Sequence, residues 1–167
     1  MSTARTGIAS RVMDPLQGPW SVSEETVRGE VVVTRGNEGL AKRVGDERFA
    51  ALVTITMPYR GKRANGQPNG DEQCRLKAFE EVLAISMCED GSTLFAGTAT
   101  GGGLRDFHFY SARPERSRRI FQRILELMCC PMLQFSIEDD PSWATFRRRL
   151  CPSRGLDEAK LSDKMRG

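Results

Sequence analysis

The sequence predicts a single α+β domain, and three of its features support this prediction. Short segments in which apolar and polar residues alternate, as in β-strands, are interspersed with two longer segments whose apolar residues recur at helical spacing. The chain has 167 residues, which is an ordinary length for one domain. Its content of 39% hydrophobic and 28% charged residues is close to the globular average and argues against a disordered chain or a coiled coil.

The first predicted element is a β-hairpin. Residues 20–23 and 30–35 are rich in strand-forming side chains, and Gly29 stands where a turn is needed. Trp20 is the expected start of the fold, because the residues before it have little periodicity and contain several glycines and prolines. We therefore predict a flexible lead-in over residues 1–18, one domain over residues 19–151 and a polar tail over residues 152–167.

A strand, a loop and a helix are predicted next. Residues 49–59 alternate, so that Val53, Ile55 and Met57 share one face of a strand and the even-numbered positions share the other. Residues 60–70 contain three glycines, two asparagines and a proline, which indicates a loop. Residues 71–89 then show helical spacing and begin with two acidic residues that suit a helix N-terminus. The apolar stripe of this helix is expected to hold Leu76, Phe79, Val82 and Leu83.

The second half of the domain has a similar order. Residues 92–100 and 105–111 are predicted to form a hairpin around Gly101–Gly103 rather than a phosphate-binding loop, because a strand follows the glycines. A helix is expected to begin at Pro114, and a last strand to cover residues 132–137. A short helix should follow, capped by Asp140 with Pro141 at its first position. The apolar stripe of the longer helix is expected to hold Ile120, Ile124, Leu127 and Met128.

After the first hairpin the predicted order is therefore β-α-β-β-α-β. This order is typical of the ferredoxin-like split fold, in which two helices pack on one face of an antiparallel sheet. We thus expect a ferredoxin-like sheet preceded by a β-hairpin and closed by a short C-terminal helix. Trp20, Asp140, Pro141 and Trp143 are expected to be structural anchors, with the indole of Trp143 packed back on the sheet beside Trp20.

The five cysteines give no sign of a metal or redox centre. They are Cys74, Cys88, Cys129, Cys130 and Cys151, and they include no C-x-x-C pair, so we expect neither a metal site nor a cofactor. The first three are interpreted as small, partly buried apolar residues of a reduced protein. No apolar run approaches the roughly 20 residues of a membrane span. Because the N-terminus also lacks the apolar stretch of a secretory leader, we predict a cytoplasmic location.

Basic residues form the first group of candidate binding residues. Arg60, Lys62 and Arg63 lie in the glycine-rich loop and could contact phosphates, although such charges more often only solvate a loop. A second basic set recurs at helical spacing as an outer stripe: Arg116, Arg119 and Arg123. The 25 basic and 22 acidic residues give a net charge of only +3, which does not by itself require a nucleic-acid partner.

Residues 105–111 hold the second group of candidates. Because side chains alternate along a strand, Phe107 and Phe109 share one face while Asp106, His108 and Tyr110 share the other. A histidine can act as a general base near neutral pH and a tyrosine as an acid. No partner nucleophile is evident, so a polar surface is the more common explanation of this face. Arg105 is included as a further candidate binding residue of the same strand.

Several short motifs occur in a defined order. They are a tryptophan that opens the first strand (Trp20), a Gly-x-Pro at the end of the loop (Gly66–Pro68), a Gly-x-Arg-x-x-x-Phe-Tyr strand (Gly103–Tyr110) and an Asp-Pro-Ser-Trp sequence (Asp140–Trp143). Over about residues 18–151, this order resembles that of the DUF695 family. The resemblance implies an α+β fold and a bacterial cytosolic setting, and it carries over no catalytic residues. That family has no known function and is sometimes associated with type B regulators of ribonuclease E, which are small inhibitors of an RNA-degrading enzyme.

The missing catalytic constellation and this resemblance favour a non-enzymatic module that acts on a protein partner, as an inhibitor or an immunity-type protein does. Two alternatives remain. One is an RNA-binding regulator that uses the basic loop and the helix arginines, but Phe107 and Phe109 are expected to face the helices, whereas RNA-binding sheets display aromatic residues on their open face. The other is a hydrolase or transferase that uses His108 as its base.

Overall fold

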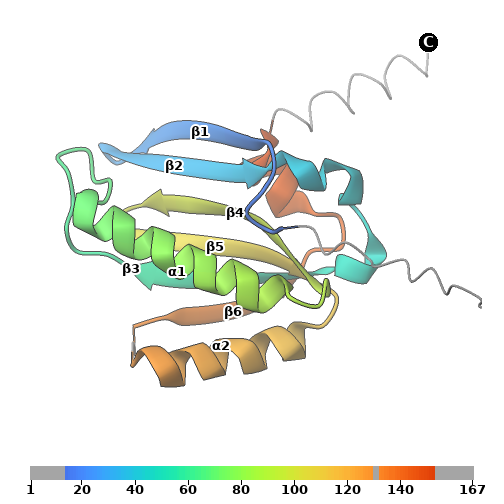
Figure 1. Cartoon of the computed structure of the whole chain (residues 1–167). Coiled ribbons are helices and arrows are strands. Elements are labelled where there is room, and N and C mark those ends of the chain that lie inside the picture. The colour runs from blue at the N-terminus through green and yellow to red at the C-terminus, as the bar shows by residue number, and fades with distance from the viewer. Residues whose placement is uncertain (1–13, 130–131, 153–167) are drawn as a thin grey trace, which may run out of the picture.

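The computed structural model describes residues 14–129 and 132–152. In this part of the chain six antiparallel strands form one sheet in the order β1-β2-β4-β5-β3-β6 (Figure 1). The strands are β1 (Trp20–Val27), β2 (Glu30–Asn37), β3 (Ala51–Pro58), β4 (Thr93–Gly101), β5 (Leu104–Ser111) and β6 (Gln134–Asp139). The predicted α+β class is therefore confirmed, and so is the predicted order of strands and long helices.

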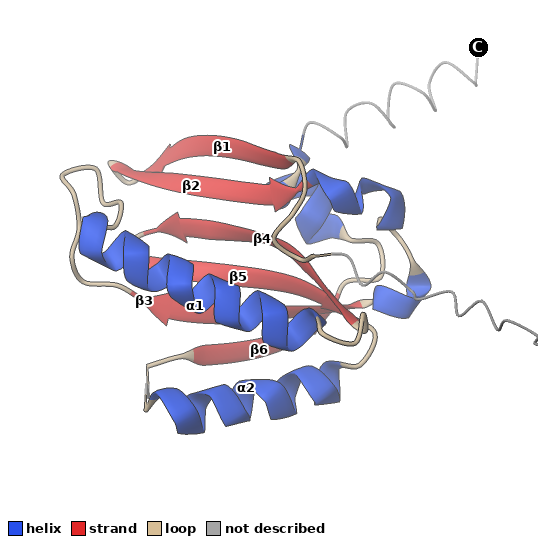
Figure 2. Ribbon diagram, viewed as in Figure 1, coloured by secondary structure: helices blue, strands red, loops and turns tan. Residues whose placement is uncertain are grey.

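Two long helices pack on one face of this sheet, as Figure 2 shows. Helix α1 (Gly70–Cys88) begins where the Asn69 side chain accepts a hydrogen bond from the backbone N–H of Glu72, which is the usual role of an N-cap residue. Helix α2 (Pro114–Met128) begins with a proline, whose missing N–H costs nothing at that position. Three short helices complete the described fold: η1 (Glu38–Arg43), η2 (Glu47–Phe49) and η3 (Phe146–Leu150).

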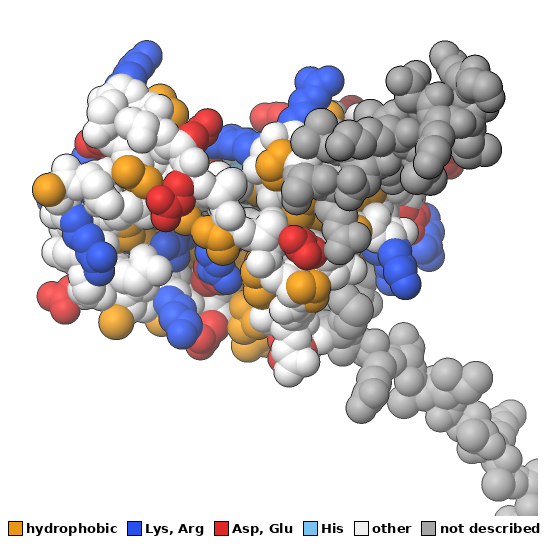
Figure 3. All heavy atoms as spheres, turned by 90° about the horizontal axis from the view of Figure 1, so that it is seen from above, with side chains coloured by type: hydrophobic (Ala, Val, Ile, Leu, Met, Phe, Trp, Pro, Cys, Tyr) orange, Lys and Arg blue, Asp and Glu red, His pale blue; other side chains and the backbone are white. Residues whose placement is uncertain are grey.

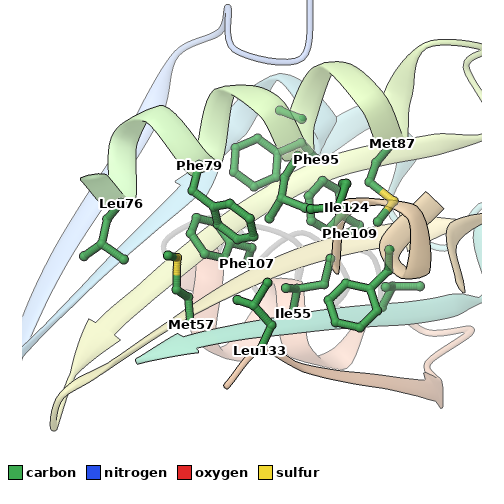
Figure 4. Close-up of a cluster of buried hydrophobic side chains, with 14 of the residues drawn as sticks. Ile55, Met57, Leu76, Phe79, Met87, Phe95, Phe107, Phe109, Ile124 and Leu133 are labelled. Carbon is green, nitrogen blue, oxygen red and sulfur yellow. The ribbon is translucent and has the colours of Figure 1, made fainter. Parts of the chain in front are cut away.

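The main hydrophobic core lies between the sheet and the two long helices (Figure 4). Strands β3 and β5 supply alternate side chains, such as Ile55 and Phe107, and α1 supplies Phe79, whose ring meets that of Phe107 edge-on at 5.5 Å. The alternation predicted for residues 49–59 is thus observed, because all three predicted apolar positions face this core. Burial of such alternating residues fixes the register, since a slip by one residue would turn each side chain to the other face.

A second, smaller core covers the opposite face of the sheet. The rings of Tyr110 and Trp143 are stacked at 3.9 Å with an angle of 2° between their planes. Phe146 and Leu150 of η3 and Phe49 of η2 pack around them. The sheet is therefore covered on both faces at the end where β5 finishes.

Four details differ from the sequence predictions. The C-terminal helical turn begins at Ala144 rather than at Pro141, which lies in a turn, and the last strand is shifted from residues 132–137 to 134–139. Trp143 does not lie beside Trp20: Trp20 packs against Phe95 in the helix-side core, whereas Trp143 lies in the core of the other face. The short helices η1 and η2 were not predicted. Most of the lead-in and nearly all of the predicted tail lie outside the described residues.

Several side chains assigned to the interior are exposed. Val82 of α1 and Leu127 and Met128 of α2 were expected in apolar stripes facing the core, but all three are exposed. The cysteine prediction was wrong in part, because Cys88 is buried as expected whereas Cys74 and Cys129 are exposed. Cys130 lies outside the described residues. Burial raises the pKa of the Cys88 thiol to about 12, so this side chain stays protonated and behaves as a small apolar residue.

Candidate functional site

Arg105 lies on the helix-covered face of β5, apart from the polar residues that alternate with it. Its guanidinium donates hydrogen bonds to Thr100 Oγ1 at 2.7 Å and to Gln73 Oε1 at 3.0 Å, and it lies 3.9 Å from the Glu80 carboxylate. Burial lowers the pKa of Arg105, and the charge of Glu80 acts in the opposite direction. With 5% of its surface exposed, Arg105 ties α1 to the β4–β5 hairpin and presents little to a ligand.

Asp106 and His108 lie on the opposite face beside two threonines of β3. Thr56 donates a hydrogen bond to Asp106 at 2.6 Å, and Thr54 Oγ1 lies 3.1 Å from His108 Nδ1. Burial lowers the pKa of His108 to about 4, although the charge of Asp106 acts to raise it. The imidazole is thus neutral at pH 7, only 3% of the residue is exposed, and its buried Nε2 has no hydrogen-bond partner among the described residues. A general base must come within hydrogen-bond reach of its substrate, and this ring is not open to one.

The low pKa of His108 makes folding stability depend on pH. The unfolded chain binds a proton at His108 near its ordinary pKa of 6.5, whereas the folded chain binds it only near 4. We therefore expect the free energy of unfolding to fall by on the order of 3 kcal/mol, from this residue alone, as the pH falls from 6.5 to 4. Urea unfolding of the wild type and of His108→Asn, whose amide can still bond Thr54, checks this expectation. Equal pH dependence in the two proteins would show that His108 is not the responsible group.

Tyr110 and Asp140 form a buried structural pair rather than part of an open polar face. The tyrosine hydroxyl donates a hydrogen bond to Asp140 Oδ2 at 2.7 Å. Burial raises the pKa of Tyr110, and the bond to Asp140 raises it further. The carboxylate of Asp140 also accepts backbone hydrogen bonds from Ala144 at 2.7 Å and Thr145 at 3.0 Å, so it caps the turn that leads into η3. Pro141 is exposed beside it.

The loop between β3 and α1 is held in place by its uncharged residues. Gln67 donates hydrogen bonds to the carbonyl groups of Val31 at 2.6 Å and Thr100 at 2.9 Å, and Tyr59 donates one to the carbonyl of Gly66 at 2.8 Å. Gly66 has a φ of +83°, which favours glycine over residues that have a Cβ. The Gly-x-Pro motif of this loop therefore determines how the loop lies on β2 and β4.

The basic residues of this loop are exposed. Lys62 lies 3.8 Å from the Glu30 carboxylate, so part of its charge is offset. The loop runs from the end of β3 to β2 at one end of the strands, whereas α2 packs over β3 and β6 on the side of the sheet away from β1 and β2 (Figure 1). The basic loop residues Arg60, Lys62 and Arg63 and the arginines of α2 are thus not brought together. Figure 3 shows Lys and Arg side chains spread among acidic ones over one face of the molecule.

A groove between α1 and α2 is the candidate site that the structure adds. It is open to solvent, has a volume of about 770 Å³ and is lined by Ile85, Ser86, Glu89, Arg116, Arg119, Ile120, Arg123, Ile124 and Leu127. Ile85 is 60% exposed and Leu127 is 80% exposed, so large apolar side chains from both helices flank this space. We call this feature the α1–α2 groove. The sequence did not predict this groove, because helical spacing placed the apolar residues of α2 in the core and gave no sign that Ile85 is exposed beside them.

The four arginines of α2 divide into two pairs. Arg116 donates a hydrogen bond to the carbonyl of Met87 at 3.1 Å and lies 2.9 Å from the Asp90 carboxylate, so it joins α2 to the end of α1. Arg118 lies 3.7 Å from Glu115 and its guanidinium covers the ring of Phe135. Arg119 and Arg123 are exposed at the groove and form no ion pair with any other described residue.

Within residues 14–129 and 132–152, no helix is both long and apolar enough to cross a membrane. The same residues contain no cluster of three His, Cys, Asp or Glu side chains placed to hold a metal ion.

The motifs noted in the sequence mark the framework of the fold. Trp20, Arg105, Tyr110, Asp140 and Trp143 all take part in packing or hydrogen bonding within the protein. Comparison with known proteins gives one match: the model of a family of unknown function, DUF695, matches residues 19–151. No curated protein and no solved structure matches the chain significantly. Because the matched residues make up most of the chain and include this framework, the protein belongs to the DUF695 family.

Proposed function

We propose that the protein is a protein-binding module whose α1–α2 groove receives a helix of its partner. The observation that carries this proposal is the exposure of Ile85 and Leu127 on either side of the groove. Contiguous apolar surface on a soluble domain is typical of an interaction site. A groove between two helices is a common binding site for an amphipathic helix, which buries its apolar face there.

The other two functions fit the geometry less well. An RNA-binding surface needs basic residues gathered along one path, and here the loop and the helix arginines lie on separate parts of the molecule (Figure 1). Phe107 and Phe109 are buried against the helices, so they are not available to stack on bases. A reaction that uses His108 as a base would require its buried Nε2 to meet a substrate.

The proposal extends to the fold and the setting of the module. We propose that β3 to β6 with α1 and α2 form a ferredoxin-like split unit, to which β1 and β2 add an edge. The strand order β4-β5-β3-β6, with two helices on one face, supports this description. The cysteines Cys74, Cys88 and Cys129 are free thiols, which suits the reducing bacterial cytoplasm that we propose as the setting.

Substitutions at the groove test this function. The double variant Ile85→Ser/Leu127→Ser removes the apolar flanks, and Val22→Ser/Val27→Ser on β1 is a matched control because these valines are also exposed. Both variants should keep stability within about 0.5 kcal/mol per substitution, because none of these side chains is in the core. We expect immobilised wild-type protein to retain one partner from its own cell lysate in near-stoichiometric amount. The groove variant should lose this partner and the control should keep it.

Two results would contradict the proposal. One is retention of no protein in comparable amount by the wild type. The other is equal retention of the same protein by the wild type and the Ile85→Ser/Leu127→Ser variant, which would place the contact elsewhere on the surface.

A further inference from the structure

We infer that the helix received by the α1–α2 groove is acidic: its apolar residues enter the groove and its carboxylates pair with Arg119 and Arg123. This inference rests on the proposed function and adds the chemistry of the partner. It is based on the two arginines of α2 at the groove that form no ion pair with other described residues, Arg119 and Arg123. It is also based on the exposed apolar residues that flank the same groove.

Two arginines at the groove supply positive charge that a partner would meet. Arg119 and Arg123 are exposed, line the groove and form no ion pair with other described residues. Glu89 is the one acidic residue among those that line the groove, which leaves the lining with an excess of positive charge. A guanidinium pairs with a carboxylate through two parallel hydrogen bonds, so this lining favours acidic side chains.

The spacing of the two arginines sets a requirement on the partner. They are four residues apart on α2, and at a rise of 1.5 Å per residue they lie about 6 Å apart along the helix axis. Acidic residues four apart on a second helix have the same spacing and lie on one side of it. A partner helix aligned with the groove can therefore meet both arginines at once with carboxylates at positions i and i+4.

The apolar residues of the groove define the other face of the partner. Ile85 of α1 and Ile120, Ile124 and Leu127 of α2 line the same space. Ile85 and Leu127 are exposed, whereas Ile120 is partly buried and Ile124 is buried below them in the core. Leucine-like residues at positions i, i+3, i+4 and i+7 of the partner would form a stripe that matches such a groove. Closure of this apolar contact excludes water and strengthens the neighbouring ion pairs.

A second copy of the chain and an RNA are less suitable occupants. In a symmetric dimer each copy would present the same arginine-bearing rim to the other, so like charges would approach one another. An RNA backbone could pair with the arginines but would leave Ile85 and Leu127 exposed to water. An acidic amphipathic helix can pair its carboxylates with the arginines and cover the apolar side chains at the same time.

Two designed peptides test this inference directly. Each is a fluorescein-labelled helix of about 18 residues with leucines at i, i+3, i+4 and i+7, long enough to be partly helical alone. One peptide carries glutamates on both sides of the leucine stripe, and the other carries lysines at the same positions. Binding to the full chain is measured by fluorescence anisotropy as NaCl is raised from about 0.05 M to about 0.5 M.

We expect the glutamate peptide to bind the wild type at least about tenfold more tightly than the lysine peptide, with the difference shrinking at high salt. Arg119→Glu/Arg123→Glu should reverse this preference. The control Arg63→Glu/Arg148→Glu makes the same change of net charge at exposed positions away from the groove and should keep the wild-type preference. Ile85→Ser/Leu127→Ser should weaken the binding of both peptides.

Several outcomes would overturn the inference. Equal binding of the two peptides, or an unchanged preference in Arg119→Glu/Arg123→Glu, would show that these arginines do not select carboxylates. Binding of a 12-nucleotide single-stranded RNA that depends on the same arginines, without peptide binding, would assign them to phosphates. A dimer in sedimentation that Ile85→Ser/Leu127→Ser dissociates would assign the groove to a second copy.

The failure of this inference can be distinguished from the failure of the proposed function. If neither charged peptide is preferred but the lysate partner is still lost in Ile85→Ser/Leu127→Ser, the groove binds a protein of other chemistry. If that variant changes neither the peptides nor the partner, both proposals fail together.

Discussion

Replacement of Trp143 by alanine is expected to lower the free energy of unfolding by about 3 to 5 kcal/mol, a large share of the stability of a domain of this size. Trp143 is fully buried, stacks on Tyr110 at 3.9 Å and contacts Phe146 edge-on at 5.7 Å. Its removal would leave a cavity in the second core, and the ring of Tyr110 would lose the indole on which it stacks. Thermal and urea unfolding of the variant measure the effect.

Two further variants identify the source of this loss. Trp143→Phe should recover part of the stability, because a smaller ring can still stack on Tyr110. Trp143 has a φ of +56°, a backbone conformation that glycine adopts freely, so Trp143→Gly should be little worse than Trp143→Ala. An unchanged melting midpoint in Trp143→Ala, together with lost partner binding, would instead place Trp143 in a binding surface.

Replacement of Glu80 by alanine is expected to cost about 3 to 5 kcal/mol as well, for an electrostatic reason. Glu80 is 5% exposed, and its carboxylate lies 3.1 Å from Arg35 and 3.9 Å from Arg105, which is equally buried. Without the carboxylate, the charge of Arg105 would remain in the interior with no opposite charge to balance it. Removal of one partner of a buried ion pair is strongly destabilising for this reason.

Matched variants separate the charge from the side-chain volume. Glu81→Ala changes an exposed acidic residue next to Glu80 on α1 and should have little effect on stability. Glu80→Met/Arg105→Met removes both charges and should be clearly less damaging than Glu80→Ala, because no buried charge is left without a partner. A cost below about 1 kcal/mol for Glu80→Ala would mean that Arg105 finds another partner or reaches water.

The sequence predicted well those elements whose structure is decided by residues close together in the chain. Residues 49–59 alternate because β3 is paired on both sides, with β5 and β6, and one face of it meets the helices. The turn of the β4–β5 hairpin could be predicted from its glycines. Gly102 and Gly103 both have positive φ, at +60° and +80°, as the tight hairpin turn requires. Both features depend on residues close together in the sequence.

The features that the sequence did not predict depend on contacts between distant residues. Nothing near Tyr110 shows that Trp143 will cover it, so this face of β5 was expected to be polar and open. The last strand was placed too early because Met132 is apolar, whereas backbone pairing with β3 extends to the polar residues Glu138 and Asp139.

The candidate site was missed for a similar reason. Helical spacing shows which residues share a face of a helix but not how much of that face a neighbour covers. Leu127 follows the apolar stripe of α2 beyond the point where the core ends, and Val82 and Ile85 lie beside the stripe of α1. The sequence therefore contains the apolar residues of the groove, and only the packing shows that they are exposed.

The second core has a consequence for the order in which the protein forms during synthesis. The described sheet can be complete once β6 has emerged from the ribosome, because β6 is the last of its strands in the chain and pairs with β3, which was made much earlier. The second core is still incomplete at that moment, since Trp143, Phe146 and Leu150 come later in the chain and only its earlier members, such as Leu40 and Phe49, are present beside Tyr110. We therefore expect a nascent chain that has just completed β6 to have a finished helix-side core and a second core that is still open to water, and partly folded chains with such exposed apolar surface are prone to aggregate.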